Sequence, residues 1–313
     1  MLISIIIPAY NVENYIEECV HSAFSQTWPE KEVICIDNNS TDGTWKKLQQ
    51  LQHQYPELII DKELKAGAPA ARNKGLRLSH GQWLQFLDAD DLLMPGKIEH
   101  QQKQIQQNPK SSFIAGACIK RDLKGIETKH IPRHDHPLKS LFITQLGITS
   151  SNLWNRTLIE QVNGWDESLK SSQEADLMFR LLQVNDQVIF DDEPLTIVRE
   201  RPSGQISQTN PKEKWMRYFN KRLEMVRWID QHRPELYIKE KDFFMDNLFG
   251  LLKIIGNEDL NAACQLYRQH LKGRYRPSPN QNHSTHPYLW LYKSFGFRGA
   301  EICRKWQNRL LGR

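Results

Sequence analysis

The sequence has few cysteines, no long apolar run and none of three common glycine-containing motifs. Its five cysteines are scattered and include no Cys-x-x-Cys pair, which disfavours a disulfide framework or a zinc ribbon and favours a reducing compartment. No run of about 18 apolar residues occurs, so we expect no membrane-spanning helix. The motifs Gly-x-x-x-x-Gly-Lys, Gly-x-Gly-x-x-Gly and Gly-x-Ser-x-Gly are also missing. Their absence argues against P-loop ATPases, Rossmann dehydrogenases and hydrolases with a nucleophile elbow.

Charge is distributed unevenly along the 313 residues. The net charge is only +5, from 42 basic and 37 acidic side chains. Residues 1–200 hold 21 basic and 27 acidic side chains, a net charge of −6, whereas residues 201–313 hold 21 and 10, a net charge of +11. Residues 268–313 carry ten basic side chains and a single acid, Glu301. This split suggests different partners for the two ends of the chain.

The first 90 residues alternate short apolar runs with longer segments of helical period. Strands alternating with helices predict a mostly parallel α/β sheet with helices on both faces. The N-terminal apolar run has no basic segment before it and no cleavage site after it, so it is interpreted as a strand and not as a signal peptide. Strands are expected at residues 2–7, 32–36, 58–60 and 83–87, and helices after Asn11 as N-cap, through residues 45–51 and over residues 69–78.

The pattern loosens beyond residue 110. It predicts a hairpin near Gly125, a helix over residues 173–184 and strands over residues 187–190 and 195–198. From about residue 212 the sequence is helical in pattern, basic and rich in Trp and Tyr. We therefore expect an α/β domain over residues 1–207 and a helical, basic region over residues 208–313.

Acidic side chains follow two of the expected strands, at the sheet edge where α/β proteins bind ligands. Asp88 and Asp90 lie two residues apart, so in extended backbone both carboxylates project to one side. Paired carboxylates suit Mg²⁺ or Mn²⁺, which fills its shell with substrate phosphates and water. Alternatively, Asp90 or Asp91 caps the helix that begins near Pro95.

Asp37 and Arg72 are candidates for nucleotide contacts. Asp37 ends the second expected strand and could accept a hydrogen bond from a base N–H, although Asp-Asn-Asn-Ser is also ordinary turn chemistry. Arg72 lies in the first turn of an expected helix, where its guanidinium could hold phosphate. A solvated surface arginine is the alternative.

Glu174 begins the helix expected over residues 173–184. Ser171 and Glu174 have the spacing of a capping box, which would account for the carboxylate structurally. An ionised glutamate is also the form that a general base needs in order to take a proton from a hydroxyl nucleophile. Both interpretations stay open at this point.

Taken together, these residues resemble the family 2 glycosyltransferases of the GT-A fold. Six short motifs occur in the family's order over about residues 2–207, and six in order are far more specific than any one. They are Ser4-Ile5-Ile6-Ile7-Pro8-Ala9-Tyr10-Asn11, Val33-Ile34-Cys35-Ile36-Asp37 with Ser40-Thr41-Asp42-Gly43-Thr44, Ala71-Arg72-Asn73, Leu87-Asp88-Ala89-Asp90-Asp91, Gly164-Trp165-Asp166-Glu167, and Gln173-Glu174-Ala175-Asp176-Leu177 with Arg180.

The resemblance implies an enzyme that transfers a sugar, with inversion, from a nucleotide-diphosphate sugar such as a UDP-sugar. The acceptor would be a hydroxyl of a saccharide or lipid-linked saccharide, in cell-surface polysaccharide biosynthesis. Asp88 and Asp90 match the Asp-x-Asp motif that holds Mn²⁺ or Mg²⁺, and Glu174 matches the general base. The residues implied in nucleotide-sugar binding are Pro8, Ala9, Tyr10, Asp37, Arg72, Asp88, Ala89 and Asp90.

The sequence departs from the family pattern at two places. Gln173-Glu174 stands where Glu-Asp is common, so Asp176 is the competing candidate for the base. Arg199-Glu200-Arg201 stands where many members have Arg-x-His, so a histidine metal ligand is replaced by an arginine that could pair with the diphosphate. A non-catalytic subunit that retains the fold and binds nucleotide sugar is the alternative function. Nucleotidyl transfer is disfavoured because Pro8-Ala9-Tyr10-Asn11 replaces the Gly-rich basic loop expected there.

The basic tail permits two interpretations. Aromatic and leucine residues lie between Lys and Arg, a pattern typical of segments that bind an anionic membrane surface. The same stripe is equally typical of a helix packed on a neighbouring domain. We expect a cytoplasmic protein with no nucleic-acid partner. On the first interpretation residues 268–313 would bind the inner face of the cell membrane, and both interpretations stay open at this point. The residues concerned are Leu289, Trp290, Leu291, Tyr292, Phe295, Phe297, Trp306, Leu310 and Leu311, with Lys293, Arg298, Arg304, Lys305, Arg309 and Arg313.

Overall fold

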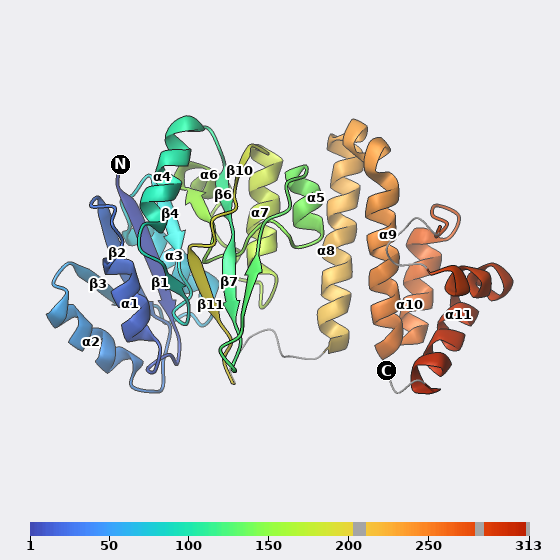
Figure 1. Cartoon of the computed structure of the whole chain (residues 1–313), viewed down its shortest axis with the longest axis horizontal. Helices are drawn as coiled ribbons and strands as arrows, with labels where there is room; N and C mark the ends of the chain where they lie inside the picture. Colours follow the sequence, from blue (N-terminus) through green and yellow to red (C-terminus); the bar gives the residue numbers. More distant parts are fainter. Residues whose placement is uncertain (203–210, 279–284, 311–313) are drawn as a thin grey trace. The chain divides into compact units, whose positions relative to one another are not determined.

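The computed structural model describes residues 1–202, 211–278 and 285–310. The chain divides into two compact units, Met1–Gln205 and Ile206–Arg313. The first unit mixes helices and strands, and the regular elements described in the second are helices (Figure 1). The domain boundary predicted at residue 207 lies outside the described residues.

The first unit is built on a seven-stranded sheet. Its strands are β1 (Ile3–Ala9), β2 (Lys31–Asp37), β3 (Leu58–Lys62), β4 (Trp83–Phe86), β6 (Phe113–Gly116), β9 (Leu153–Asn155) and β10 (Val188–Asp191), in the order β10-β6-β9-β4-β1-β2-β3. β1, β2, β3 and β4 pair in parallel, as do β6 and β10, whereas β9 is antiparallel to both its neighbours. The mostly parallel sheet expected from the sequence is confirmed.

Helices cover both faces of this sheet. Successive side chains of a strand point to opposite faces, so the apolar strands present buried side chains on each face. Ile5 and Val33 point into a core shared with α1 (Ile16–Phe24), α2 (Thr44–Gln54) and α4 (Lys97–Gln107). Ile34 and Ile36 instead pack on α3 (Ala68–Leu78), and Gly75 of α3 lies so close to Ile6 that a Cβ would come within 2.3 Å of it. Further helices are α5 (Pro137–Phe142), α6 (Arg156–Gln161) and α7 (Gln173–Val184).

One helix start differs from its prediction. Asn11 was expected to cap the first helix, but α1 begins five residues later and Asn11 has a left-handed backbone (φ 50°). Its side-chain oxygen accepts a hydrogen bond from the Thr41 N–H at 2.8 Å. The prediction is wrong because Asn11 shapes the loop after β1 and does not begin the helix.

A smaller, four-stranded sheet places β11 (Thr196–Arg199), the last strand described in this unit, beside the residues that follow β4. It also contains β5 (Leu92–Leu93), β7 (Cys118–Arg121) and β8 (Glu127–His130), in the order β5-β11-β7-β8. The hairpin predicted near Gly125 joins β7 and β8, and Gly125 has the positive φ of 80° that this turn needs. β11 pairs with β5, which places Arg199 and Arg201 beside the acidic residues that follow β4.

The described helices of the second unit are α8 (Pro211–His232), α9 (Pro234–Glu258), α10 (Leu260–Leu266), a short π-helix (Tyr267–Leu271) and α11 (His286–Leu310), which is kinked at Gly296. Phe249 is the centre of its core, with the rings of Tyr267, Tyr275, Tyr288, Tyr292 and Phe297 within 6.5 Å between centroids. None of the helices described here has both the length and the apolar composition that crossing a membrane requires.

The aromatic residues of α11 divide between core and surface. Leu289 and Phe297 are buried, and the Phe297 ring packs against Phe249 of α9 within the same unit. Three others are open to solvent: Trp290 and Trp306 are each 64% exposed and Phe295 is 59% exposed. The stripe seen in the sequence therefore contains a buried face and an exposed aromatic face.

Candidate active site

The carboxyl ends of β4, β1 and β2 lie side by side and position the first group of predicted residues. Pro8 and Ala9 are the last residues of β1, and Ala9 pairs in register with Asp37 at the end of β2. The Leu87 N–H donates to the Ile6 carbonyl at 2.9 Å, which holds the residues after β4 beside β1. Tyr10 follows β1 and is 57% exposed. The sheet thus brings together the predicted nucleotide-binding residues from three strand ends.

Asp37 is buried, and its Oδ1 atom has no hydrogen-bond partner among the described residues. The adjoining turn is built by other side chains. The Asn38 amide donates to the carbonyls of Glu63 and Lys65, each at 2.8 Å. A buried acceptor without a partner is costly unless a ligand supplies the donor. The turn interpretation therefore does not account for Asp37, whereas the base N–H of a nucleotide would satisfy it.

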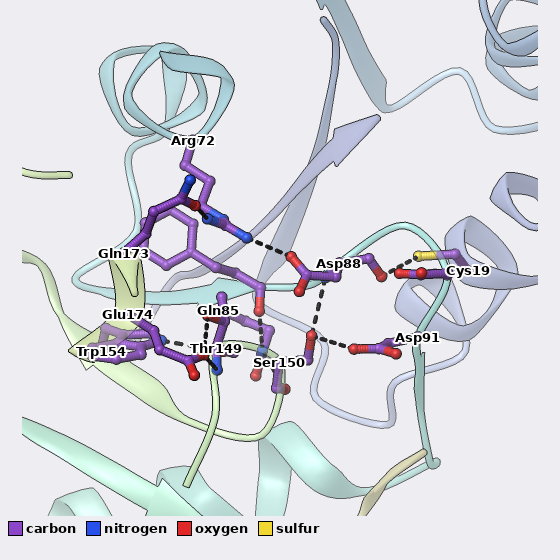
Figure 2. A network of polar contacts seen from close by, with 12 residues as sticks. Cys19, Arg72, Gln85, Asp88, Asp91, Thr149, Ser150, Trp154, Gln173 and Glu174 are labelled. Atoms are coloured by element: carbon purple, nitrogen blue, oxygen red, sulfur yellow. Dashed lines mark hydrogen bonds and ion pairs between the residues drawn. The ribbon is translucent and has the colours of Figure 1, made fainter. Parts of the chain in front are cut away.

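Arg72 is buried beneath the site and is not a solvated surface arginine. Its guanidinium lies 4.4 Å from the centroid of the Trp165 ring. It donates to Asp88 Oδ1 at 2.6 Å and to Gln173 Oε1 at 3.1 Å (Figure 2). Arg72 is therefore the physical link between the end of β4 and the start of α7.

The residues after β4 are held by a loop that the sequence analysis did not single out. The Asp88 N–H donates to Ser150 Oγ at 3.1 Å, and the Ser150 hydroxyl donates to Asp91 Oδ2 at 2.6 Å (Figure 2). Asp91 also accepts from the Arg199 N–H at 3.2 Å. The next helix begins at Lys97 with Gly96 as N-cap and no side-chain cap. The interpretation of Asp90 or Asp91 as a helix cap is therefore wrong.

Burial and mutual repulsion perturb the carboxylates that follow β4. Burial and the neighbouring Asp88 raise the pKa of Asp90, and burial together with Asp88 and Asp90 raises that of Asp91. A divalent cation would relieve this repulsion, and carboxylate oxygens are the ligands that Mg²⁺ and Mn²⁺ prefer. In the described parts of the chain no three His, Cys, Asp or Glu side chains form a ready metal cage. A cation on Asp88 and Asp90 would complete its shell with substrate phosphates and water.

Glu174 lies in the first turn of α7 and is held from outside its own helix. Its Oε2 accepts from the Thr149 N–H at 3.2 Å and from the Thr149 hydroxyl at 2.9 Å (Figure 2). The N-cap residue, Ser172, has φ 57° and makes no side-chain cap. The capping-box interpretation is therefore wrong.

Burial raises the pKa of Glu174, the Thr149 hydrogen bonds oppose that rise, and the charge of Asp88 adds to it. The carboxylate is thus within electrostatic reach of the Asp-x-Asp segment. Asp176, the competing candidate, is buried in an ion pair with Arg180 at 2.8 Å. This pairing favours Glu174 as the base.

The residues at the two departures from the family pattern, Gln173 and Arg201, each contact a residue of the site. Gln173 uses its amide oxygen to accept from Arg72, so an uncharged group takes the place of the missing carboxylate. Arg201 donates to Asp90 Oδ2 at 3.5 Å and to the Asn11 carbonyl at 2.9 Å. Arg199 donates to the Asp90 carbonyl and to Glu18.

Three residues with clear roles in this geometry were missed as site residues: Thr149, Ser150 and Trp165. Thr149 and Ser150 belong to the polar run Thr149-Ser150-Ser151-Asn152 just before the apolar Leu153-Trp154. A polar run leading into a buried strand is the signal that could have identified them. Trp165 belongs to the motif Gly164-Trp165-Asp166-Glu167. Nothing in the sequence indicates that the Arg72 guanidinium lies over its ring.

The comparison with known families is decisive for the class. The sequence profile of glycosyl transferase family 2 matches residues 4–165, just over half the chain. The chain belongs to this family.

Among curated relatives, an uncharacterized glycosyltransferase of Rickettsia felis is 28% identical over 280 residues, covering 85% of this chain and 44% of that protein. The putative teichuronic acid biosynthesis glycosyltransferase TuaG of Bacillus subtilis is 42% identical over 101 residues, covering 32% of this chain and 40% of TuaG. The chain spans less than half the length of the Rickettsia relatives.

Solved structures agree on the fold. Residues 1–349 of TarS from S. aureus, in complex with UDP-GlcNAc, superpose with a TM-score of 0.61 at 16% identity, covering 98% of this chain and 92% of that one. The mannosyltransferase PcManGT from Pyrobaculum calidifontis, in complex with GDP-Man and Mn²⁺, gives a TM-score of 0.53 at 17% identity, with 99% and 87% covered. The GT-A fold expected from the sequence is confirmed.

Proposed function

We propose that the chain is a metal-dependent inverting glycosyltransferase that uses a UDP-sugar donor. The observation that carries this proposal is the bridge made by Arg72, which contacts Asp88 on one side and Gln173, next to Glu174, on the other. Inverting transfer needs charge stabilisation at the leaving diphosphate and a base at the attacking hydroxyl. The bridge holds groups suited to these two tasks in one site.

The donor would lie along the carboxyl ends of β1, β2 and β4. Asp37 would accept from the base through its unpartnered Oδ1, and Pro8, Ala9 and Tyr10 would line the nucleotide. Asp88 and Asp90, flanking Ala89, would hold Mn²⁺ or Mg²⁺. When bound, the cation would neutralise negative charge on the leaving diphosphate. Arg72 would bring a second positive charge to the same end of the donor.

Glu174 would take the proton from the acceptor hydroxyl. Its raised pKa makes the deprotonated carboxylate a stronger base than a solvated glutamate. Thr149 donates twice to one carboxylate oxygen and so fixes the orientation of the group. The acceptor would be a saccharide or a lipid-linked saccharide in cell-surface polysaccharide synthesis, at the inner face of the membrane. The similarity to TuaG and the exposed aromatic side chains of α11 support this part of the proposal.

Thermal stabilisation by nucleotides tests the donor and the metal together. UDP-sugars should raise the melting temperature of the full chain in the presence of Mn²⁺, because ligand binding to the native state stabilises it. Asp90→Asn should lose most of the Mn²⁺-dependent part of the shift, while Asp192→Asn, at an exposed site, should retain it. A shift indifferent to chelator and to Asp90→Asn would exclude the metal role. Donor binding without any hydrolysis or transfer would favour the non-catalytic alternative.

A further inference from the structure

A buried lysine and two buried glutamines lie next to the loop over residues 148–152, and none of the three has a part in the function proposed above. Lys97 is the first residue of α4, Gln101 lies one turn later on the same helix, and Gln85 belongs to β4. Each of these residues is at most 1% exposed. Burying an ammonium group is costly, so its presence here calls for an explanation.

Lys97 donates to the side-chain oxygens of both glutamines. The contact with Gln101 measures 2.9 Å, and Gln85 is the second acceptor. Both acceptors are neutral amides, which compensate a buried charge less well than a carboxylate does. Because buried charged groups can often be replaced by apolar side chains without loss of stability, stability alone does not explain this lysine.

The lysine determines which way each amide points. An amide has an oxygen that accepts and an NH₂ group that donates, whereas an ammonium group only donates. The side-chain oxygens of Gln85 and Gln101 must therefore face Lys97, and their NH₂ groups must face away from it. Burial lowers the pKa of Lys97 to about 7, and the neutral amine still has an N–H group for each oxygen.

The two NH₂ groups are directed at consecutive carbonyls of the loop. Gln85 donates to the Ser150 carbonyl at 2.8 Å (Figure 2), and Gln101 donates to the Ser151 carbonyl at 3.4 Å. Gly116 leaves room for the second contact, because a Cβ on it would lie 2.2 Å from the Ser151 oxygen and 3.0 Å from the Gln101 nitrogen. One lysine thus orients the donors that hold two successive peptide groups.

The same loop contacts both halves of the proposed site. Thr149 donates to Glu174, and Ser150 Oγ contacts the Asp88 N–H and the Asp91 carboxylate (Figure 2). The Ser150 carbonyl that the β4 glutamine binds belongs to the same residue as this hydroxyl and directly follows Thr149. A shift of that peptide group would therefore displace the groups that orient the base and the residues after β4.

Resting on the transferase function proposed above, we propose that Lys97 is a positioning residue for the transfer reaction. It acts through Gln85 and Gln101 on the loop that orients Glu174. Its task is to keep the two NH₂ groups on the loop carbonyls. A purely structural role would need only a favourable contact at the lysine, whereas the positioning role also needs the donors that face the loop.

Gln85→Glu in the full chain separates these two roles. The new carboxylate keeps an oxygen for Lys97 and adds an opposite charge, but it cannot donate to the Ser150 carbonyl. Hydrogen exchange, followed by mass spectrometry without substrate, should become faster over residues 87–91 and 148–152. UDP affinity, measured with chelator, should stay within about threefold, because the proposed base contact of the nucleotide lies outside this network.

The second readout is hydrolysis of the UDP-sugar that most raises the melting temperature, with Mn²⁺ present and water as the acceptor. Its kcat should fall by about tenfold to 10²-fold in Gln85→Glu, the cost of a misplacement of about 1 Å. Should this variant fail to fold, the double variant Lys97→Met, Gln85→Met replaces both partners by apolar side chains, which often preserves stability. It should show the same faster exchange and the same loss of kcat.

Gln52→Glu is the matched control, because Gln52 is exposed on α2 and donates to the Leu58 carbonyl at 3.0 Å. It should change neither readout. Unchanged exchange over residues 148–152, wild-type kcat in the folded variant, or an equal loss in Gln52→Glu would overturn the proposal. A wild-type chain without any hydrolysis or transfer would count against the transferase function, and faster exchange in Gln85→Glu would still show that the network holds the loop.

Discussion

Glu174 is held by a loop residue from outside its own helix, and this arrangement leads to a prediction about its charge. Glu174→Gln preserves the shape and the contact with Thr149 but removes the basic carboxylate. Transfer should fall by about 10²- to 10⁴-fold, the usual contribution of general-base catalysis, while UDP affinity stays within about twofold. Glu160→Gln, at an exposed ion pair, is the control. Steady-state kinetics and nucleotide titration separate the two effects, and wild-type rates in Glu174→Gln would place the base elsewhere.

The pH profile gives a second readout of the same residue. A base must be deprotonated to work, so kcat should fall as the pH drops through the pKa of Glu174. Because burial raises that pKa, the fall should begin above the range of an ordinary glutamate. A profile whose acid limb lies at the usual glutamate pKa would contradict the raised value.

Arg201 stands where many family members have a histidine, and its contact with Asp90 predicts competition with the metal. A cation that binds Asp90 must displace the guanidinium, which lies 3.5 Å from Oδ2, and is repelled by it. Arg201→Gln should therefore bind Mn²⁺ about threefold to tenfold more tightly without nucleotide, the effect expected of one partly buried charge. If the displaced Arg201 then contacts the diphosphate, UDP should bind more weakly to the same variant.

Mn²⁺ titration followed by electron paramagnetic resonance measures the first effect directly. Arg121→Gln, which breaks an exposed pair with Glu127, serves as the control. Unchanged or weaker Mn²⁺ binding in Arg201→Gln would show that Arg201 does not compete for Asp90.

At the residue scale, the sequence singled out Asp37, Arg72 and Asp88, which the fold brings to one site, but it misjudged the partners of some neighbouring residues. Asp37, Arg72 and Asp88 lie at strand and helix ends, where local pattern is informative. The partners that hold them come from far away: Ser150 meets the Asp88 backbone across 62 positions. Such contacts are set by tertiary packing, so no local rule could predict them. The cap interpretations of Asp91 and Glu174 failed for the same reason.

At the element scale, the longer strands and helices could be predicted from the sequence. Strands of two or three residues that pair with distant segments could not. β1 is a continuous apolar run of seven residues, α3 and α7 are helices of 11 and 12 residues, and the sequence predicted each of them. β5 has two residues and β9 three, too few for a pattern to appear. Their pairing with β11 and with β4 and β6 depends on the closed fold. These short strands nevertheless flank the segments that form the site. β9 follows the loop whose Ser150 contacts Asp88 and Asp91, and β5 follows the acidic residues themselves.

The start of α4 contains a buried ammonium group that should affect stability. Lys97 donates to Gln85 and, at 2.9 Å, to Gln101, and burial lowers its pKa to about 7. In the unfolded chain the lysine keeps its proton up to about pH 10.4. The unfolded state therefore binds more protons between these values, and stability should rise with pH above 7.

Lys97→Met should remove this dependence, which for one group amounts to at most about 1.4 kcal/mol per pH unit. The measurement is the difference between wild type and Lys97→Met in the free energy of unfolding at pH 7.0, 7.75 and 8.5. Lys103→Met, at an exposed position on the same helix, should show no such trend. A constant difference for Lys97→Met would mean that the buried ammonium keeps its ordinary pKa.

At the scale of the whole molecule, the uneven charge has a different structural basis in each of the two units. The acidic excess of residues 1–200 includes Asp88, Asp90, Asp91 and Glu174, which the fold collects into one site. On the proposed function, an anionic donor approaching that site would need a cation and Arg72 to offset the repulsion. The basic tail does not act as one block, because Arg304 is bound to Glu301 and to Asn257 of α9. Part of its charge therefore stabilises the helical unit itself.

The exposed aromatic residues of α11 lead to a prediction about membranes. Trp290, Phe295 and Trp306 are exposed beside basic residues, whereas Leu289 and Phe297 are buried. Aromatic side chains inserted at the headgroup level, with Lys and Arg near anionic lipid, give reversible binding. The full chain should sediment with vesicles that contain phosphatidylglycerol and should remain in solution with neutral phosphatidylcholine vesicles, and added salt should weaken the binding.

The triple variant Trp290→Ser, Phe295→Ser and Trp306→Ser should lower the partition coefficient at least about tenfold, since each inserted ring contributes on the order of 1 kcal/mol or more. Ile238→Ser is the control, because Ile238 is also an exposed apolar residue, at 77%, but lies on α9 and not on α11. If the triple variant partitions like wild type, or if Ile238→Ser loses as much, the exposed face of α11 is not a membrane contact. The basic charge of the tail would then serve the packing of α9 and α11, as the contacts of Arg304 and Lys305 already do.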